Sequence, residues 1–232
     1  MDTTEPGQTV RSDGRPTANI YVDGFNLYRR CLQRHPTLKW LDLTALASFI
    51  MPDYRINKVH YFTAHLRLGL IADPGTPVRQ QMYLRALTTD PRVTIHLGKF
   101  RNDKRPMPVH PQKIDPETGK FITVNVRKLE EKGSDVNLAT RLLADAFQED
   151  ADIYVVLTND SDQVGPLTTM KTELSVQTGI IFPMPSHRSS KDLVKTRPDF
   201  IGHVTPEALE ASQFPHTLRD AVGKFHRPPK WS

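Results

Sequence analysis

Four aspartates stand at places where an α/β fold collects functional groups. Asp23 follows an apolar run at 18–22, and Asp160 and Asp162 follow a second apolar run further along the chain. Asp135 opens a strongly amphipathic stretch. In an open parallel sheet, functional side chains gather outside the carboxyl ends of the strands. We therefore expect Asp23, Asp160 and Asp162 at one sheet edge, joined by Asp135 if its helix begins there.

Converging carboxylates repel one another and raise each other's pKa unless a cation compensates. Mg²⁺ or Mn²⁺ fits this role because hard divalent cations prefer oxygen ligands and keep positions open for water and phosphate. Such an ion can activate water for the in-line displacement of a phosphodiester. The predicted catalytic and metal-binding residues are Asp23, Asp135, Asp160 and Asp162.

Each aspartate also has a purely structural interpretation. Asp23 with Gly24 can be a turn that ends a strand, and the segment 159–162 can cap the helix that follows it. Asp135 in a first helical turn is more often a partner of the helix dipole than a ligand. Their joint occurrence at matching strand ends favours the functional interpretation.

Polar neighbours of the aspartates are candidates for contact with a substrate. Asn26 offers a neutral oxygen or amide, Lys132 can contact a phosphate, and Ser161 lies between the two late aspartates. Thr158 and Asn159 can hold the loop that carries Asp160.

Residues 98–128 form a basic segment with eight lysines and arginines against three acidic residues. Its substrate-binding candidates are Lys99, Arg101, Lys104 and Arg105. A basic strip beside an acidic cluster suits a polyanion such as RNA, although a solvated basic loop is an equal alternative. Aromatic side chains that could stack on unpaired bases, or simply pack in the protein, are Phe100, Phe121 and Trp231.

Strand-like and helix-like segments alternate along the chain, which predicts an α/β fold with a mainly parallel central sheet between two layers of helices. The expected strands are 18–22, 58–63, 93–97, 152–157 and 179–182, and the expected helices are 26–34, 41–51, 77–87, 134–147, 164–173 and 206–212. The run at 152–157 is nearly all apolar, which is typical of a strand buried on both faces. The Pro-rich segment 101–120 predicts an excursion, with Asp115–Gly119 as the turn of a hairpin.

The predicted organisation has three parts. Residues 1–17 form an irregular N-terminal segment without the apolar core of a signal peptide, 18–205 form the domain with 98–128 as a basic insertion, and 206–232 form a helix and an irregular arm. One cysteine, Cys31, permits no intrachain disulfide, and no apolar run has the length of a membrane span. We expect a cytoplasmic protein with no membrane partner.

Three segments together resemble the signature blocks of the NYN (LabA-like) domain of the PIN-like nuclease superfamily. They are Ile20–Tyr28, Lys132–Asn137 and Leu157–Gln163, in the family's order and spacing, and the resemblance covers roughly 19–185. The third block departs from the usual Ser-Gly-Asp-Ser-Asp-Phe, with Thr158 and Asn159 before the aspartates and Gln163 after them. The resemblance implies a PIN-like α/β/α sandwich and Mg²⁺- or Mn²⁺-dependent cleavage of RNA.

The expected function is thus a metal-dependent ribonuclease that acts on single-stranded RNA, with DNA also open as a substrate. The main alternative is a catalytically silent module that binds nucleic acid with the same fold. A phosphatase of the haloacid-dehalogenase type needs a second aspartate two residues after the first, where this chain has Phe25. The choice between Mg²⁺ and Mn²⁺, the RNA that is cut, and a homodimeric state all stay open.

Overall fold

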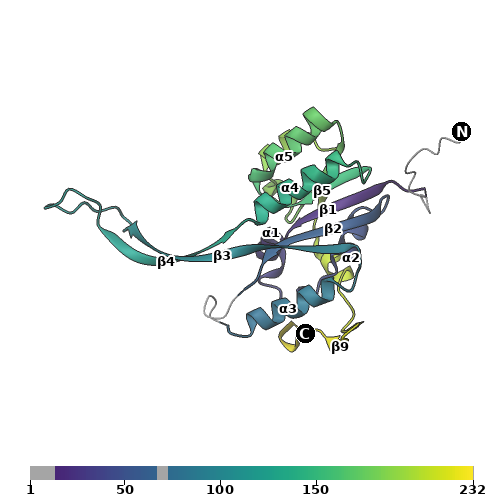
Figure 1. The fold of residues 1–232 in the computed structure, drawn as a ribbon, viewed down its shortest axis with the longest axis horizontal. Helices are drawn as coiled ribbons and strands as arrows, with labels where there is room; N and C mark the ends of the chain where they lie inside the picture. Colours follow the sequence, from purple (N-terminus) through teal and green to yellow (C-terminus); the bar gives the residue numbers. More distant parts are fainter. Residues whose placement is uncertain (1–13, 67–72, 232) are drawn as a thin grey trace, which may run out of the picture.

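The structure is a computed structural model that describes residues 14–66 and 73–231. A seven-stranded sheet in the order β4-β3-β2-β1-β5-β6-β7 forms its centre (Figure 1). All neighbouring strands run parallel except β3 and β4. The strands are β1 (Thr17–Asp23), β2 (Arg55–Ala64), β3 (Val93–Pro108), β4 (Thr123–Lys132), β5 (Ile153–Leu157), β6 (Gln177–Phe182) and β7 (Phe200–His203).

Helices cover both faces of this sheet, which confirms the predicted three-layer α/β/α sandwich. One face packs against α2 (Leu43–Ile50), α3 (Thr76–Leu87) and α7 (Pro206–Ala211). The other face packs against α4 (Ser134–Phe147), α5 (Val164–Thr169) and α6 (Lys191–Lys195). Figure 1 shows α4 and α5 on the side of the sheet opposite α3. Among the described residues, no helix combines the length and the apolar character that a membrane crossing requires.

Strand β5 is buried on both faces, as its apolar run predicts. Val155 and Leu157 belong to the core beneath α2 and α3, whereas Tyr154 and Val156 belong to the core beneath α4 and α5. Successive side chains of a strand point to opposite faces, so both cores are filled from one short segment. The same alternation in β1 favours one register, and Asp23 is the last residue of that strand, opposite Phe62 of β2.

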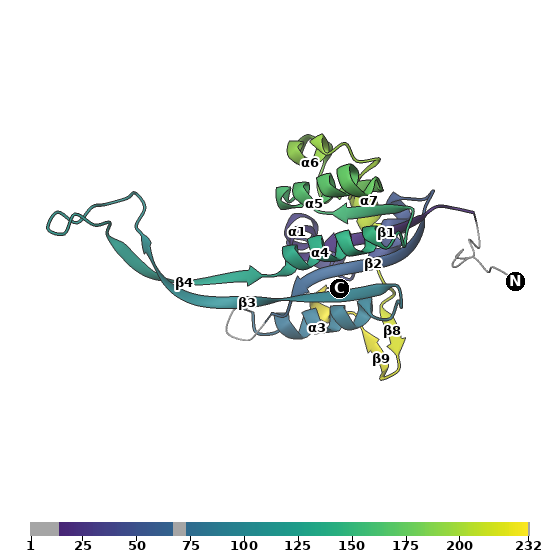
Figure 2. The ribbon, with the colours of Figure 1, turned by 45° about the horizontal axis from the view of Figure 1, so that its top comes forward.

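The basic insertion forms a long two-stranded ribbon that projects from the body (Figures 1 and 2). Strand β3 pairs with β2 only as far as Gly98, and from Lys99 to Pro108 it pairs with β4 alone. The sequence predicts a hairpin here with a strand that ends at 97, whereas β3 continues through Pro106 to Pro108. A proline without an N–H is tolerated where a strand has an unpaired edge.

The C-terminal segment is more regular than the expected irregular arm. After α7, β8 (Thr217–Asp220) and β9 (Gly223–His226) form an antiparallel hairpin. Its Asp220 is held by Arg85 of α3 through Nε at 2.6 Å, and Trp231 packs 6.3 Å from the buried ring of Trp40. Trp231 is therefore a packing residue. Of the predicted irregular segment 1–17, residues 1–13 lie outside the described part of the chain.

Gly24, the first residue of the short helix α1 (Gly24–Leu27), should not tolerate a side chain. A Cβ there would lie 2.6 Å from the backbone oxygen of Phe62 and 2.7 Å from the ring of Tyr61. We expect Gly24→Ala to lower the free energy of unfolding by about 1–3 kcal/mol, because backbone must move to relieve the clash. Gly165→Ala is the matched control, since nothing lies within 4 Å of its Cβ. Equal urea midpoints for the two variants would contradict this expectation.

Candidate metal centre

Asp23 is held rigidly at the carboxyl end of β1. It caps the N-terminus of α1, and its Oδ1 accepts the backbone N–H of Asn26 at 2.9 Å. Its Oδ2 accepts the hydroxyl of Thr158 at 2.9 Å. The side chain is therefore fixed from two elements, β1 and the loop after β5. The predicted loop-holding role of Thr158 corresponds to this contact.

Asp135 reaches the same sheet edge because of the turn between β4 and α4. Gly133 adopts a left-handed conformation with φ of 101°, which turns the chain directly from the strand into the helix. Glu131 then accepts the backbone N–H of Ser134 at 3.1 Å and its hydroxyl at 2.8 Å. Gly133 is the N-cap residue, and Ser134 is the first residue of the helix. The helix thus begins with Asp135 in its first turn, directed at the end of β1.

Asp160 comes from the loop after β5. Its backbone N–H donates to Thr158 Oγ1 at 3.0 Å, and its carboxylate accepts the backbone N–H of Asp162 at 3.1 Å. Asn159 fastens the same loop, because its backbone N–H donates to Asn26 and its side chain accepts the N–H of Ser190 at 2.7 Å. Asn159 therefore has a role of its own at the position that differs from the NYN pattern.

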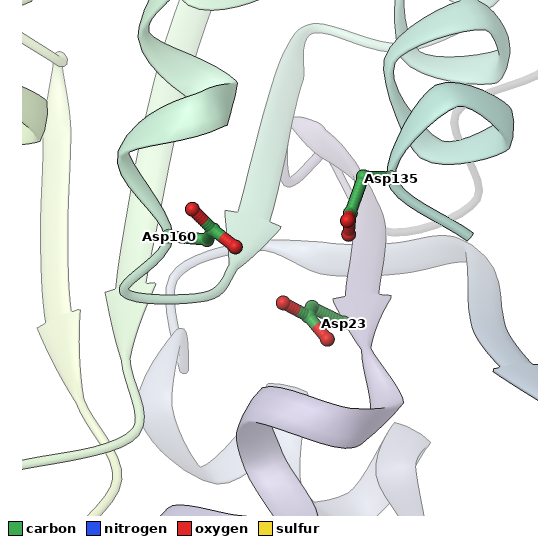
Figure 3. Close-up of side chains that lie close together, drawn as sticks. All are labelled: Asp23, Asp135 and Asp160. Carbon is green, nitrogen blue, oxygen red and sulfur yellow. The ribbon is translucent and has the colours of Figure 1, made fainter. Parts of the chain in front are cut away.

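Three of the four predicted aspartates converge, as Figure 3 shows for Asp23, Asp135 and Asp160. Each offers a carboxylate oxygen, and these three atoms lie within 4.8 Å of one another. Asp162 does not belong to this group, since it sits on the short 3₁₀ turn that the Asp160 carboxylate caps. We call Asp23, Asp135 and Asp160 the acidic trio.

Mutual repulsion and burial alter the protonation of the acidic trio. Burial raises the pKa of Asp23, and the nearby charge of Asp160 adds to that effect. Burial and then the charges of Asp23 and Asp160 raise the pKa of Asp135 to about 6. Within the described part of the chain, no lysine or arginine forms an ion pair with these carboxylates. An oxygen-only ligand set that lacks a cationic partner fits Mg²⁺ or Mn²⁺.

The stability of the metal-free protein should depend on pH in a defined direction. Because the folded pKa of Asp135 lies near 6, above the ordinary value of 3.8, the folded state binds more protons than the unfolded state between these values. Stability should therefore fall as the pH rises from about 4 to about 6. Urea unfolding in EDTA at pH 4.5 and 7.5 measures the change in free energy of unfolding. The Asp135→Asn variant should lose the part of this pH dependence that Asp135 causes. This expectation would be contradicted if the difference in free energy of unfolding between the metal-free wild-type protein and the variant rose with pH.

The acidic trio lies in a cleft of about 620 Å³. Its walls also carry a phenyl ring and several charged side chains that the sequence analysis did not single out, namely Phe25, Arg29, Arg30, Glu130 and Glu131. Arg29 and Arg30 follow Asn26 by about one helical turn, and this spacing was a signal for their presence at the same sheet edge. The cleft therefore combines carboxylates, cations and an aromatic ring.

The polar candidates have different outcomes. Asn26 lines the cleft and receives the backbone N–H of Asn159 at 3.3 Å. Lys132 also lines it, with Nζ 3.2 Å from Glu130. Ser161 is exposed at the start of the 3₁₀ turn and is absent from the described lining of the cleft.

The basic candidates of the insertion lie along the ribbon instead of in the cleft. Lys99, Arg101, Lys104 and Arg105 all belong to β3 beyond the point where β2 ends. Asp103 lies within 3.3 Å of both Arg101 and Arg105, so part of the basic charge is internally compensated. Phe100, at the base of the ribbon, packs edge-on against Phe25 at 5.7 Å. Phe121, at the distal end, is half exposed.

Comparison with solved structures supports the fold alone. The chain is similar to a protein of unknown function from Vibrio parahaemolyticus, with a TM-score of 0.51 and 14% sequence identity, over 85% of this chain and 98% of that one. No family model matches the sequence. The resemblance to the NYN domain therefore stays a prediction.

Comparison with curated proteins corrects the predicted class of enzyme. The chain is 30% identical over 221 residues to 6-hydroxy-3-succinoylpyridine 3-monooxygenase HspA of Pseudomonas putida, covering 86% of this chain and 70% of the relative. A monooxygenase is an oxidoreductase, so the prediction of a metal-dependent nuclease is wrong. Aspartates at a sheet edge indicate a metal-binding site, but they do not determine which reaction the site serves. The chain belongs to the family of 6-hydroxy-3-succinoylpyridine 3-monooxygenase HspA.

Proposed function

We propose that this protein is an oxidoreductase that transfers one oxygen atom to a small, anionic, hydroxylated heteroaromatic compound, with Mg²⁺ or Mn²⁺ at the acidic trio. The observation that carries the proposal is the mixed lining of the cleft, where the trio lies with Phe25, Arg29 and Arg30. Membership of a monooxygenase family supports the type of reaction. The lone thiol of Cys31 favours the reducing environment of the cytoplasm.

The chemistry of the cleft matches that class of substrate. The compound in the relative's name is a pyridine that carries a hydroxyl and a succinoyl group, and the latter ends in a carboxylate. Arginines bind carboxylates through paired N–H groups, and an aromatic ring can lie against Phe25. The bound cation would attract the hydroxyl oxygen and lower its pKa. Arg29, Arg30 and Lys132 are the cations that can fix the carboxylate.

The transfer of one oxygen atom from dioxygen also needs a two-electron reductant, for which we propose a reduced nicotinamide. One oxygen atom is inserted into a bond at the ring carbon that reacts, so that this bond breaks and two bonds to oxygen form, and the other oxygen atom leaves as water. The nicotinamide supplies a hydride, which is two electrons and one proton, and a second proton from the solvent completes the water. In this scheme the protein binds and orients the heteroaromatic compound, while Phe25 and Leu129 restrict water at the cleft wall.

Oxygen uptake with 6-hydroxy-3-succinoylpyridine, NADH and Mn²⁺ tests the proposal. We expect uptake to depend on all three additions and one ¹⁸O atom from labelled dioxygen in the product. Arg30→Gln should raise KM about tenfold to a hundredfold, because a charged hydrogen bond to the substrate is lost. The exposed Arg34, outside the described cleft lining, gives the matched control Arg34→Gln. The proposal would be contradicted if the Mn²⁺-loaded protein neither bound this compound nor turned it over.

We propose a second function for the ribbon, the binding of single-stranded RNA or DNA. Residues 98–128 carry an excess of basic side chains, and Lys104 lies opposite Arg127 on one face of the ribbon. Such a pair can follow a phosphate backbone. Fluorescence anisotropy with a labelled RNA should give an affinity that falls steeply with salt and falls further in a Lys104→Glu variant, whose changed residue lies on β3 and leaves the β4 edge unchanged. An RNA affinity that changed neither with the salt concentration nor with the substitution would contradict this second function.

A further inference from the structure

Strand β4 is an edge strand, and one of its two edges has no neighbouring strand. It stands last in the sheet order, and beyond Gly98 the ribbon that it forms with β3 has no third strand. Figures 1 and 2 show the ribbon well away from the body of the protein. An isolated two-stranded ribbon is only marginally stable in water, and an unpaired edge is a template for another strand. The edge of β4 is thus a surface on which a partner strand can add.

The order of charges along β4 indicates which partner strand can pair with its free edge. Around Leu129 the sequence reads Arg127, Lys128, Leu129, Glu130, Glu131, so two cations are followed by an apolar residue and two anions. This order is complementary to itself when read in the opposite direction. We propose that a second copy of this chain pairs with β4 in antiparallel fashion, about a twofold axis at Leu129.

In this pairing every charge of the segment meets an opposite charge. Lys128 lies across from Glu130 of the second copy, and Arg127 lies across from Glu131. The twofold axis repeats both pairs, and Leu129 meets its own counterpart, as an isologous interface requires. Opposite charges across antiparallel strands stabilise a sheet, and like charges directly opposite destabilise it. Moving the axis by one residue would set Lys128 against Lys128 or Glu130 against Glu130, so the charges also select the register.

The same arrangement accounts for apolar side chains at the distal end of the ribbon. They are Met107, Ile114, Phe121, Ile122 and Val124, with 40–62% of their surfaces exposed. In the proposed register, Val124 lies opposite Ser134 of the second copy, at the start of its α4. Each ribbon would therefore bring its apolar end to the other copy's body, beside the metal cleft, and bury it there. A four-stranded sheet β3-β4-β4-β3 would join the two copies.

Engineered disulfides test the register directly. In a Cys31→Ser background, Leu129→Cys places two thiols opposite each other on the twofold axis, at the 4.5–5.5 Å Cα separation of paired antiparallel residues. We expect it to form a covalent dimer on mild oxidation. Arg127→Cys is the matched control, since its two copies would be four residues apart along the strands and should stay unlinked. Equal crosslinking of the two variants, or none at position 129, would overturn the proposal.

Charge reversal tests the complementarity with the same full-length chain. Sedimentation velocity should show a species of twice the 26.4 kDa chain mass. Lys128→Glu alone and Glu130→Lys alone should each weaken the dimer about tenfold, since two attractive pairs become repulsive. An equimolar mixture of the two variants should dimerise again, as should the chain that carries both changes. A monomer at all concentrations, or a dimer indifferent to the single reversals, would contradict the proposed interface.

Discussion

Replacing Asp135 by asparagine is expected to weaken Mn²⁺ binding by about a hundredfold. The change removes one of three charged ligands, and hard divalent cations depend on carboxylate oxygens for affinity. Isothermal titration calorimetry at pH 7.5 measures the effect. Affinity should also fall as the pH drops through 6, because the proton then competes with the metal for Asp135, whose pKa burial and the neighbouring carboxylates raise to about 6.

The control for this experiment is Asp162→Asn. Asp162 is only two residues from Asp160, but it is exposed and outside the acidic trio. Its replacement should change the Mn²⁺ dissociation constant by less than about threefold, because the Asp162 charge acts on the metal only through solvent-screened electrostatics and not as a ligand. Equal losses in the two variants would show that the metal is not held as the trio requires.

Replacing Asp145 by alanine is expected to cost about 3–5 kcal/mol of unfolding free energy. Asp145 is a completely buried residue of α4 and accepts the Tyr21 hydroxyl at 2.8 Å and Arg141 Nε at 2.9 Å. His60 Nε2 lies 3.2 Å from the same carboxylate. Its removal leaves the buried Tyr21 hydroxyl and the partly exposed Arg141 guanidinium without their common acceptor, and the loss of one partner of a buried pair is far more costly than the loss of a surface pair.

Chemical denaturation of the Asp145→Ala variant measures this cost. Asp192→Ala is the comparison, because Asp192 pairs with Lys195 at 2.8 Å on the surface of α6. An exposed pair of this kind contributes about 0–1 kcal/mol. A loss of less than about 1 kcal/mol at Asp145 would mean that the buried network is not a main support of the sheet. Metal affinity should stay unchanged in both variants, since neither residue touches the cleft.

The sheet was predictable because its strands are marked by their own residues. The continuous apolar run of β5 indicates burial on both faces, and Asp23 and Asp160 follow strands that end at one edge. Helix α4 matches its expected bounds of 134–147 because its apolar residues recur with helical spacing. These signals are local, so they can be recognised in a single sequence.

Other parts were not predicted, and most of them depend on contacts between segments that are distant in the sequence. Asp162 was expected to join the site with Asp160, but the 3₁₀ turn after Asp160 directs it elsewhere. The short strand β7 was missed because only four residues pair, and its place depends on β6. The hairpin of β8 and β9 depends on Arg85 of α3 and on the ring of Trp40. Tertiary contacts decide the last two, whereas the turn at Asp162 is a local one that the Asp160 carboxylate caps.

The most direct test of the acidic trio is X-ray diffraction from crystals grown with Mn²⁺, recorded at the manganese absorption edge. We predict an anomalous peak between Asp23, Asp135 and Asp160, with metal–oxygen distances of about 2.0–2.3 Å. Asp162 should lie outside the coordination sphere. A peak only at another site, or no peak in crystals that contain excess Mn²⁺, would contradict the account of this cleft as a metal centre.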